Sequence, residues 1–267
     1  MKIAFLTSGG IAPCLSASIA SLIENYIQSD SSHKFIGYLN GYYGLLKGKS
    51  IDLDFKSAEE LSALKEFGGT ILGNSRVKLT NIDDCLKNGY IKKNEIPIQV
   101  AANQLIADNV DILHTIGGDD TNITACDLAL FLKEKGHDLT VVGLPKTVDN
   151  DIYPISQTLG ADTAAEQGAI FFENIVNENT TSRRQLIIHE VMGRHCGWLT
   201  AATARYYKQR LNNKRFYDKN GLYKKCWDIH AIYIPELEIN IQNESERLSN
   251  VMDSYDCVNI FLSEGAG

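Results

Sequence analysis

Two short polar clusters, each placed directly after a short apolar run, limit this chain to a small set of folds. Gly117-Gly118-Asp119-Asp120-Thr121 follows the run at 111–116, and Pro145-Lys146-Thr147-Val148-Asp149-Asn150-Asp151 follows the run at 139–144. Apolar runs of this length, bounded by turn residues, are typical of buried parallel strands. Because open α/β sheets bind ligands beyond the carboxyl ends of such strands, both clusters are predicted to face one crevice.

The residue types in these clusters are those that phosphoryl transfer requires. Glycines let backbone N–H groups approach a phosphate, and the two aspartates of the first cluster can hold a divalent cation. Lys146 supplies a fixed positive charge, and Asp149 is a candidate base. A plain turn or a helix cap is the structural alternative. It is disfavoured because adjacent carboxylates at a buried strand end repel unless a cation or hydrogen bonds compensate them.

Size and composition exclude several classes of protein. A chain of 267 residues with 44% hydrophobic residues is expected to form two α/β domains. The formal net charge of −7 argues against nucleic-acid binding. No apolar run approaches the roughly 18 residues of a membrane span, so we expect no membrane partner. The six cysteines are scattered without a Cys-x-x-Cys pair, which predicts a reducing, cytoplasmic location.

Strand-like and helical patterns alternate along the chain, with a natural break near residue 151. This alternation predicts a mostly parallel sheet with helices on both faces. Predicted strands lie at 2–7, 34–39, 111–116, 139–144, 185–191, 230–234 and 257–262. Predicted helices lie at 15–26, 97–108, 121–135, 161–176, 197–208 and 244–252. Thr121 and Asn122 are candidate caps of the third helix, and 40–44 reads as a turn.

Other predicted strand ends also carry polar or glycine-rich turns. Ser8-Gly9-Gly10 follows the first strand, Met192-Gly193-Arg194 follows the fifth, and Pro235-Glu236 follows the sixth. The first of these is weak evidence alone, since a tight turn needs glycine whatever it binds. The recurrence of such groups at several strand ends argues for one shared ligand site.

With these motifs the chain resembles the phosphofructokinases, and among them the pyrophosphate-dependent kind. The resemblance runs almost from Met1 to Gly267. Besides the clusters above, it rests on Ser-Gly-Gly-x-x-Pro at 8–13, Gly-Tyr-x-Gly-Leu at 41–45 and Leu-Gly-Asn-Ser-Arg at 72–76. It implies two Rossmann-like three-layer α/β/α domains with mostly parallel sheets and an active site in the cleft between them. Residues 1–151 would bind the phosphoryl donor and Mg²⁺, and residues 152–267 would bind the sugar phosphate.

The implied reaction moves a phosphoryl group from pyrophosphate to the 1-hydroxyl of D-fructose 6-phosphate. It would reversibly give fructose 1,6-bisphosphate and phosphate, in glycolysis and gluconeogenesis, in a homo-oligomer that is a dimer or a tetramer. The implied donor-binding residues are Gly10, Arg76 and Lys146, with Asp119 as the ligand of Mg²⁺. The implied catalytic residues are Asp149 as the base, Lys146 and Asp120. The implied substrate-binding residues are Thr147, Val148, Asp149, Asp151, Met192, Gly193, Arg194 and Glu236.

Asp120 and Lys146 indicate which donor is used. The matching positions of ATP-dependent relatives are typically glycine, which leaves room for the α-phosphate of the nucleotide. A carboxylate there would repel that phosphate by roughly 4 kcal/mol at about 4 Å and an effective dielectric constant of about 20. Pyrophosphate is therefore the expected donor, and an ATP-dependent kinase of the same fold is the alternative.

The chain also departs from the family pattern. Cys14 and Ser16 stand where the first loop of the family usually has glycine and asparagine. Either Arg183 or Arg184 could match the arginine that often reaches a neighbouring subunit, and the sequence does not choose between them. The family's chains continue well past the Ser-Glu-Gly-Ala element at 263–266. We therefore expect an incomplete second domain, with a truncated, non-catalytic binding or oligomerisation subunit as a third hypothesis.

Overall fold

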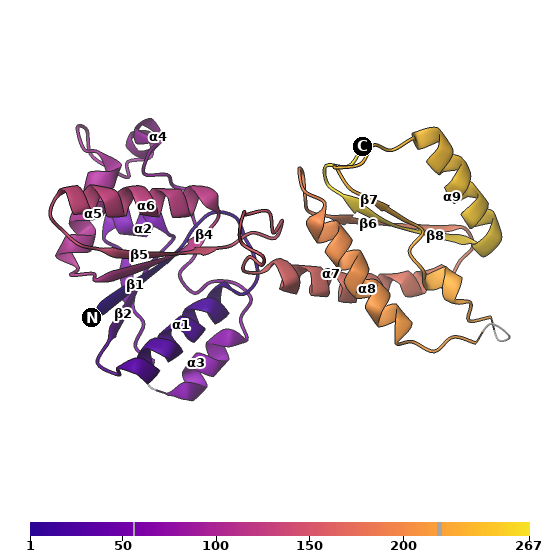
Figure 1. The fold of residues 1–267 in the computed structure, drawn as a ribbon, viewed down its shortest axis with the longest axis horizontal. Coiled ribbons are helices and arrows are strands. Elements are labelled where there is room, and N and C mark those ends of the chain that lie inside the picture. Colours follow the sequence, from indigo (N-terminus) through magenta and orange to yellow (C-terminus); the bar gives the residue numbers. More distant parts are fainter. Residues whose placement is uncertain (56, 218–220) are drawn as a thin grey trace. The chain divides into compact units, whose positions relative to one another are not determined.

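In this computed structural model, the chain is described over residues 1–55, 57–217 and 221–267 and divides into two compact units (Figure 1). Unit 1 comprises Met1–Thr147 and Thr158–Gly160, and unit 2 comprises Val148–Gln157 and Ala161–Gly267. The second polar cluster is thus shared, with Lys146 and Thr147 in unit 1 and Val148 to Asp151 in unit 2. The donor and sugar-phosphate roles expected for 1–151 and 152–267 stay predictions.

Unit 1 contains a five-stranded sheet in the order β3-β2-β1-β4-β5. The strands are β1 (Lys2–Thr7), β2 (Lys34–Tyr38), β3 (Ser50–Asp52), β4 (Ile112–Gly117) and β5 (Thr140–Pro145). Only β3 runs antiparallel to its neighbour; the other described pairs are parallel. The order of the strands reverses between β1 and β4, and a crevice forms at such a switch point in open α/β sheets.

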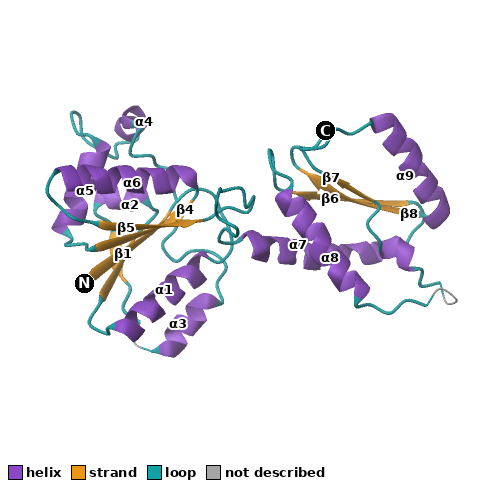
Figure 2. Cartoon of the chain, in the orientation of Figure 1, coloured by secondary structure: helices purple, strands orange, loops and turns teal. Residues whose placement is uncertain are grey.

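Helices cover both faces of this sheet (Figures 1 and 2). On one face lie α1 (Leu15–Ser29) and α3 (Ala58–Lys65). On the other lie α2 (Tyr42–Lys47), α5 (Pro97–Ala107) and α6 (Asp119–Glu134), with α4 (Ile82–Lys87) at their edge. Successive residues of β1 point to opposite faces of the sheet, as in any strand. Ile3 and Phe5 pack toward α1, whereas Ala4 and Leu6 pack toward α5.

Unit 2 contains a three-stranded parallel sheet in the order β6-β8-β7. Its strands are β6 (Gln185–Val191), β7 (Ala231–Tyr233) and β8 (Cys257–Ser263). The helices α7 (Ala161–Ile175) and α8 (Trp198–Asn212) pack on one face, and α9 (Ile241–Tyr255) packs on the other. Two short 3₁₀ turns, Val176–Thr180 and Lys224–Trp227, complete the described elements.

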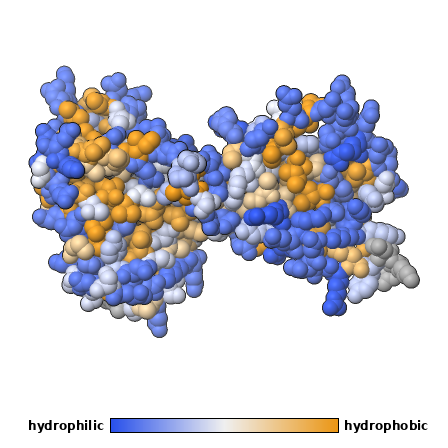
Figure 3. Space-filling view, in the orientation of Figure 1, coloured by the Kyte–Doolittle hydropathy of each residue, from blue (hydrophilic) through white to orange (hydrophobic). Residues whose placement is uncertain are grey.

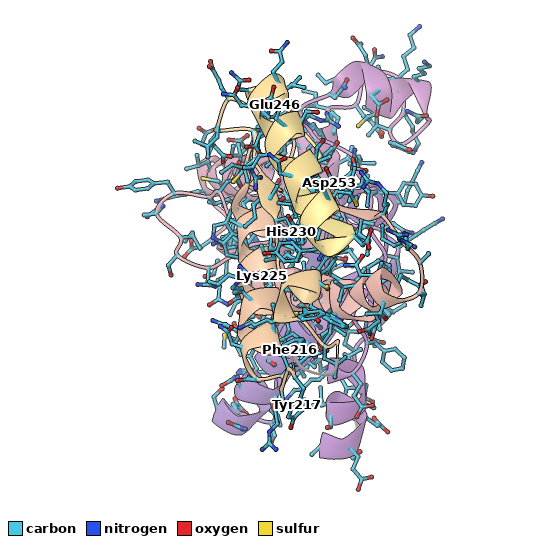
Figure 4. All side chains as sticks on the ribbon, turned by 90° about the vertical axis from the view of Figure 1, so that its right-hand side faces the viewer. Phe216, Tyr217, Lys225, His230, Glu246 and Asp253 are labelled. Carbon is cyan, nitrogen blue, oxygen red and sulfur yellow. The ribbon has the colours of Figure 1, made fainter. Side chains whose placement is uncertain are left out.

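The two faces of the unit 2 sheet are held by different contacts. On the α7 and α8 face, the ring of Phe172 lies 4.5 Å from Phe261 and 4.7 Å from Tyr207 between centroids. On the other face, the buried Val258 and Ile260 of β8 form a core cluster with Ala231, and Val251 and Met252 of α9 pack against it. Figure 4 shows His230 beside α9, whose Glu246 is exposed to solvent. The final strand is therefore packed on both sides.

The mostly parallel sheets with helices on both faces confirm the predicted fold class. The prediction that Thr121 and Asn122 cap the helix after β4 is wrong. Helix α6 begins at Asp119 with Gly118 as its N-cap, and no side chain caps it. Asn122 instead donates from Nδ2 to the carbonyl of Gly117 (3.1 Å) and accepts from Thr115 Oγ1 (3.0 Å), which ties the helix to β4. Asp119 and Asp120 consequently lie in the first helical turn.

Several short elements differ from the sequence prediction. The stretch predicted as a turn at 40–44 leads directly into α2, and β3, α3 and α4 were not predicted. These elements have three to eight residues, too few to show a clear hydrophobic period. The longer elements agree with prediction to within a few residues at their ends.

Some apolar side chains remain at the surface. Figure 3 shows apolar side chains reaching the surface of unit 1 around β5 and α6, where β5 is an edge strand. In unit 2, every second residue of β6 is exposed, and two of these are the apolar residues Leu186 (54% exposed) and Ile188 (51% exposed). Among the described residues, no helix combines the length and the apolar character needed to cross a membrane.

Candidate functional site

Three strand ends of unit 1 converge at Gly9, which follows β1. Gly9 has a φ of +87°, a left-handed conformation that favours glycine. A Cβ at this position would lie 3.7 Å from Lys146 Nζ, 3.7 Å from Thr121 Oγ1 and 3.8 Å from the backbone N of Gly118. The structure therefore brings together the ends of β1, β4 and β5, as the sequence predicted for their polar clusters.

Lys146 is the buried cation of this cluster. The residue is only 3% exposed, and its Nζ donates a hydrogen bond to the carbonyl oxygen of Gly10. Its backbone N donates to the carbonyl of Gly117 (2.9 Å), which fixes β5 beside β4 at the site. Burial lowers the pKa of Lys146, and the nearby positive charge of Arg76 lowers it further. Two cationic side chains are thus held next to the glycine turn.

The irregular segment 73–79 joins the glycine turn from the side. The carbonyl of Ser75 accepts hydrogen bonds from Gly9 N (3.0 Å) and Ser8 Oγ (2.9 Å). Asn74 donates from Nδ2 to the carbonyl of Gly10 (3.4 Å). Within the described part of the chain, Asn74 Oδ1 and Ser75 Oγ are buried without a hydrogen-bond partner. Such buried unpaired atoms next to a glycine turn suit a polar ligand.

Asp119 and Asp120 are both exposed in the first turn of α6. The positive end of the helix dipole stabilises carboxylates there. Asp120 forms an ion pair with Lys78, with Oδ2 and Nζ 2.6 Å apart. Lys78 is not among the site residues predicted from the sequence. The signal that could have found it is alternation, because Val77 and Leu79 are buried core residues while Lys78 between them is exposed.

The described residues contain no ready-made metal cage, since no group of three His, Cys, Asp or Glu side chains is placed to hold an ion. Mg²⁺ does not require one. It commonly binds one or two carboxylates, keeps several waters and takes further oxygens from substrate phosphates. The exposed carboxylate of Asp119, beside a glycine turn and two cations, therefore has the chemistry of a Mg²⁺ ligand.

Asp149, in unit 2, is a carboxylate with an altered proton affinity. Burial raises its pKa, and the negative charges of Asp151 and Glu264 raise it further. Its carbonyl accepts a hydrogen bond from Cys196 Sγ (3.4 Å). A carboxylate whose pKa is raised toward neutral pH is a better proton acceptor, and such shifts gather at functional sites.

The ends of β6 and β8 are locked together around Gly193. Its carbonyl accepts hydrogen bonds from Ser263 Oγ (2.6 Å) and Gly265 N (3.2 Å). A Cβ at Gly265 would lie 1.8 Å from the carbonyl oxygen of Arg194, so only glycine fits. Arg194 is exposed, and its Nη2 lies 3.1 Å from Glu264 Oε1. The turn after β6 therefore presents a guanidinium group from a rigid backbone.

Glu236 and Met192 complete the predicted residues at the strand ends of unit 2. Glu236 accepts a hydrogen bond at Oε1 from the backbone N of Gly197 (2.8 Å), the residue before α8. This contact connects the turn after β7 to the start of α8. Met192 follows β6 directly and is 59% exposed.

The predicted site residues fall into two groups, one in each unit. Unit 1 holds Gly10, Arg76, Asp119, Asp120, Lys146 and Thr147. Unit 2 holds Val148, Asp149, Asp151, Met192, Gly193, Arg194 and Glu236. Arg183 and Arg184 lie before β6, at its opposite end from Met192, and face the acidic residues Asp256 (3.7 Å) and Asp253 (2.7 Å) respectively. Within each unit the other residues stand at or next to the carboxyl ends of strands.

The sheet of unit 1, with a glycine turn at its switch point, places the chain among the doubly wound, Rossmann-like α/β proteins. The family model described as Phosphofructokinase matches residues 2–267, and the chain belongs to that family. The chain is 55% identical over 266 residues to pyrophosphate--fructose 6-phosphate 1-phosphotransferase of Methylomonas methanica, covering 100% of this chain and 65% of that protein. It is 54% identical to the protein of the same name from Methylotuvimicrobium alcaliphilum, again covering 100% and 65%.

A solved structure supports the same fold. The crystal structure of pyrophosphate-dependent phosphofructokinase from Marinobacter aquaeolei matches with a TM-score of 0.77 and 26% identity. The match covers 100% of this chain and 61% of that one. The chain therefore spans about 65% of the length of these curated relatives.

Proposed function

We propose that this chain carries the donor and acceptor residues of a pyrophosphate-dependent phosphofructokinase. The reaction would transfer a phosphoryl group reversibly from pyrophosphate to the 1-hydroxyl of fructose 6-phosphate. The observation that carries the proposal is that the buried Lys146 and the Asp120 carboxylate both stand at strand ends of unit 1. The names of the two relatives described above support the same donor and acceptor.

The donor would bind to unit 1. Backbone groups of the turn at Gly10, with Arg76 and Lys146, would neutralise the phosphates of pyrophosphate. Lys146 would act on the leaving phosphate, which carries no nucleoside to orient it. This supply of positive charge matters because phosphoryl transfer depends mainly on positioning and on electrostatic stabilisation of the transferring group.

Asp120 would select against ATP. Its carboxylate would occupy the space that glycine leaves for the α-phosphate in ATP-dependent relatives. The ion pair with Lys78 changes the expected cause of ATP exclusion, since a compensated carboxylate repels a phosphate less than a free one does. Exclusion would then rest on the volume of the side chain more than on its charge.

Asp119 would hold Mg²⁺. The bound ion would neutralise phosphate charge during transfer. The exposed carboxylate in the first turn of α6 supports this assignment.

The acceptor would bind to unit 2, where Asp149 would take the proton from the sugar 1-hydroxyl. Its raised pKa supports this role. Arg194, Glu236, Met192 and Gly193 would hold the sugar phosphate, together with Asp151 and Val148 and with Thr147 of unit 1. These side chains and backbone groups follow β5, β6 and β7 in the sequence.

We further propose a homo-oligomer located in the cytoplasm. The oligomer is what the family resemblance implies, and the apolar residues Leu186 and Ile188 on the surface of β6 are suited to an interface. The six scattered cysteines support a reducing compartment.

A donor comparison tests the proposal. Turnover of fructose 6-phosphate is measured with pyrophosphate and with ATP, each with Mg²⁺, and binding of both donors is measured by isothermal titration calorimetry. We expect turnover with pyrophosphate only. Faster turnover with ATP would contradict the donor assignment, and binding without turnover would favour a non-catalytic subunit.

A further inference from the structure

The ion pair between Lys78 and Asp120 has no evident role in holding the fold. Its side chains are 50% and 71% exposed, and exposed ion pairs contribute close to zero to stability. Asp120 is already stabilised by the N-terminus of α6. A reason for this pair must therefore be sought at the donor site beside it.

Lys78 is nevertheless placed firmly. Its neighbours Val77 (8% exposed) and Leu79 (2% exposed) are anchored in the core under α2 and α5. Its carbonyl accepts hydrogen bonds from Asn81 N (3.2 Å) and Cys85 Sγ (3.6 Å). The same segment is tied at Ser75 to the glycine turn. The backbone that carries Lys78 is thus fixed relative to the donor residues.

A lone carboxylate at position 120 would create an electrostatic problem. Pyrophosphate is itself a multiply charged anion, so a free negative charge that repels the α-phosphate of ATP would repel pyrophosphate as well. A free charge would therefore disfavour ATP only together with some loss of pyrophosphate affinity. A carboxylate whose charge is cancelled can still exclude the larger donor by occupying its space.

We infer that Lys78 is a positioning residue for donor selection: it holds the Asp120 carboxylate in place and cancels its charge, so that Asp120 excludes ATP by volume without weakening the binding of pyrophosphate. The inference rests on the proposed function, in which pyrophosphate is the donor. It assigns the discrimination to the pair of residues and not to Asp120 alone.

Binding of pyrophosphate, measured by calorimetry with Mg²⁺ and without sugar phosphate, tests the inference in four proteins. These are the wild type, Lys78→Met, Asp120→Asn and the double variant. Lys78→Met removes the cation at similar volume, and we expect pyrophosphate to bind about tenfold more weakly. In the double variant no uncompensated carboxylate remains, so we expect binding to recover to within about threefold of the wild type.

Lys65→Met is the matched control. Lys65 pairs with Glu24 at 2.5 Å with side-chain exposures of 36% and 38%, between α3 and α1 on the opposite face of the sheet from α6. We expect this variant to bind pyrophosphate as the wild type does. Equal weakening by both lysine variants would overturn the inference, because it would indicate a general loss of positive charge.

The volume argument is tested with ATP. Asn has nearly the volume of Asp, so Asp120→Asn should still exclude ATP, whereas Asp120→Gly should admit it. Admission of ATP by Asp120→Asn would overturn the inference and restore exclusion by charge. Failure of Asp120→Asn to rescue Lys78→Met would also overturn it, since Lys78 would then be a direct ligand of pyrophosphate.

These results separate the inference from the proposed function. Unchanged pyrophosphate binding in Lys78→Met, together with normal turnover of fructose 6-phosphate, overturns the inference alone. The expected binding pattern without any turnover supports the inference and contradicts the proposed reaction. A KM effect without a comparable fall in kcat is expected where turnover is measurable, because Lys78 acts on donor binding.

Discussion

Lys146 donates a hydrogen bond from its buried ammonium group to the carbonyl oxygen of Gly10, although the two residues lie 136 positions apart. The bond joins the residue after β5 to the turn after β1, which carry two of the three predicted donor-binding residues, Lys146 and Gly10. A buried amine that donates to a neutral carbonyl keeps its positive charge at a cost, as the lowered pKa shows. That cost is understandable if an anionic donor completes the site.

Lys146→Met should lower turnover without lowering stability. The substitution keeps most of the side-chain volume and removes the charge, so we expect turnover with pyrophosphate to fall by at least about 10²-fold. Because burial lowers the pKa of Lys146, protonation of this amine costs the folded state stability at pH values below the ordinary lysine pKa, which includes neutral pH. We therefore expect Tm at pH 7 to be unchanged or higher. A large fall in Tm would assign Lys146 a structural role instead.

Gly10→Ala should weaken donor binding without disturbing the fold. Within the described residues, a Cβ at Gly10 would meet no atom closer than 4 Å. If a phosphate approaches this backbone, the added methyl group should weaken pyrophosphate binding by about tenfold or more while Tm stays constant. Calorimetry and thermal unfolding measure both effects.

Gly9→Ala is the informative comparison for Gly10→Ala. Its φ of +87° makes any side chain costly, by about 1–2 kcal/mol. This variant should therefore lose stability whatever the ligand is. Equal pyrophosphate affinity in Gly10→Ala and the wild type would mean that the donor does not contact the turn.

Asp149→Asn should lower activity and raise stability. Loss of a general base typically lowers kcat by about 10²- to 10⁴-fold, and we expect at least the lower figure, with fructose 6-phosphate affinity nearly intact. The folded state raises the pKa of Asp149, so its stabilising effect is present at low pH and is lost as pH rises through the raised value. Removing the charge should accordingly increase Tm at pH 7. Near-normal kcat would place the base elsewhere.

The pH profile should depend on Asp151. Its negative charge contributes to the raised pKa of Asp149, so Asp151→Asn should lower that pKa. The acid limb of kcat/KM, which reports the base in the free enzyme, should then move to lower pH. The position of the limb is the readout, because the level of activity also falls if Asp151 contacts the sugar. An unmoved limb would show that another group controls it.

Much of the fold follows from local pattern. The long strands and helices were predicted because their apolar periods extend over enough residues to be distinguished, as in α1 and α7. The start of α6 was misplaced by two residues, because the hydrogen-bonding capacity of Asn122 suits a cap as well as its actual bond to Gly117. Side-chain chemistry alone does not distinguish these two uses.

The sequence by itself determined the alternating α/β pattern, the strand ends that carry polar groups, and the resemblance that gives each group an expected role. Only the tertiary structure decided that Lys146 reaches Gly10, that Lys78 pairs with Asp120, and that Asp149 has a raised pKa. The physical reason is the separation in sequence over which each kind of interaction acts. Periodicity and turn chemistry act between neighbours in sequence, whereas burial and charge pairing depend on atoms that the fold brings together from distant positions.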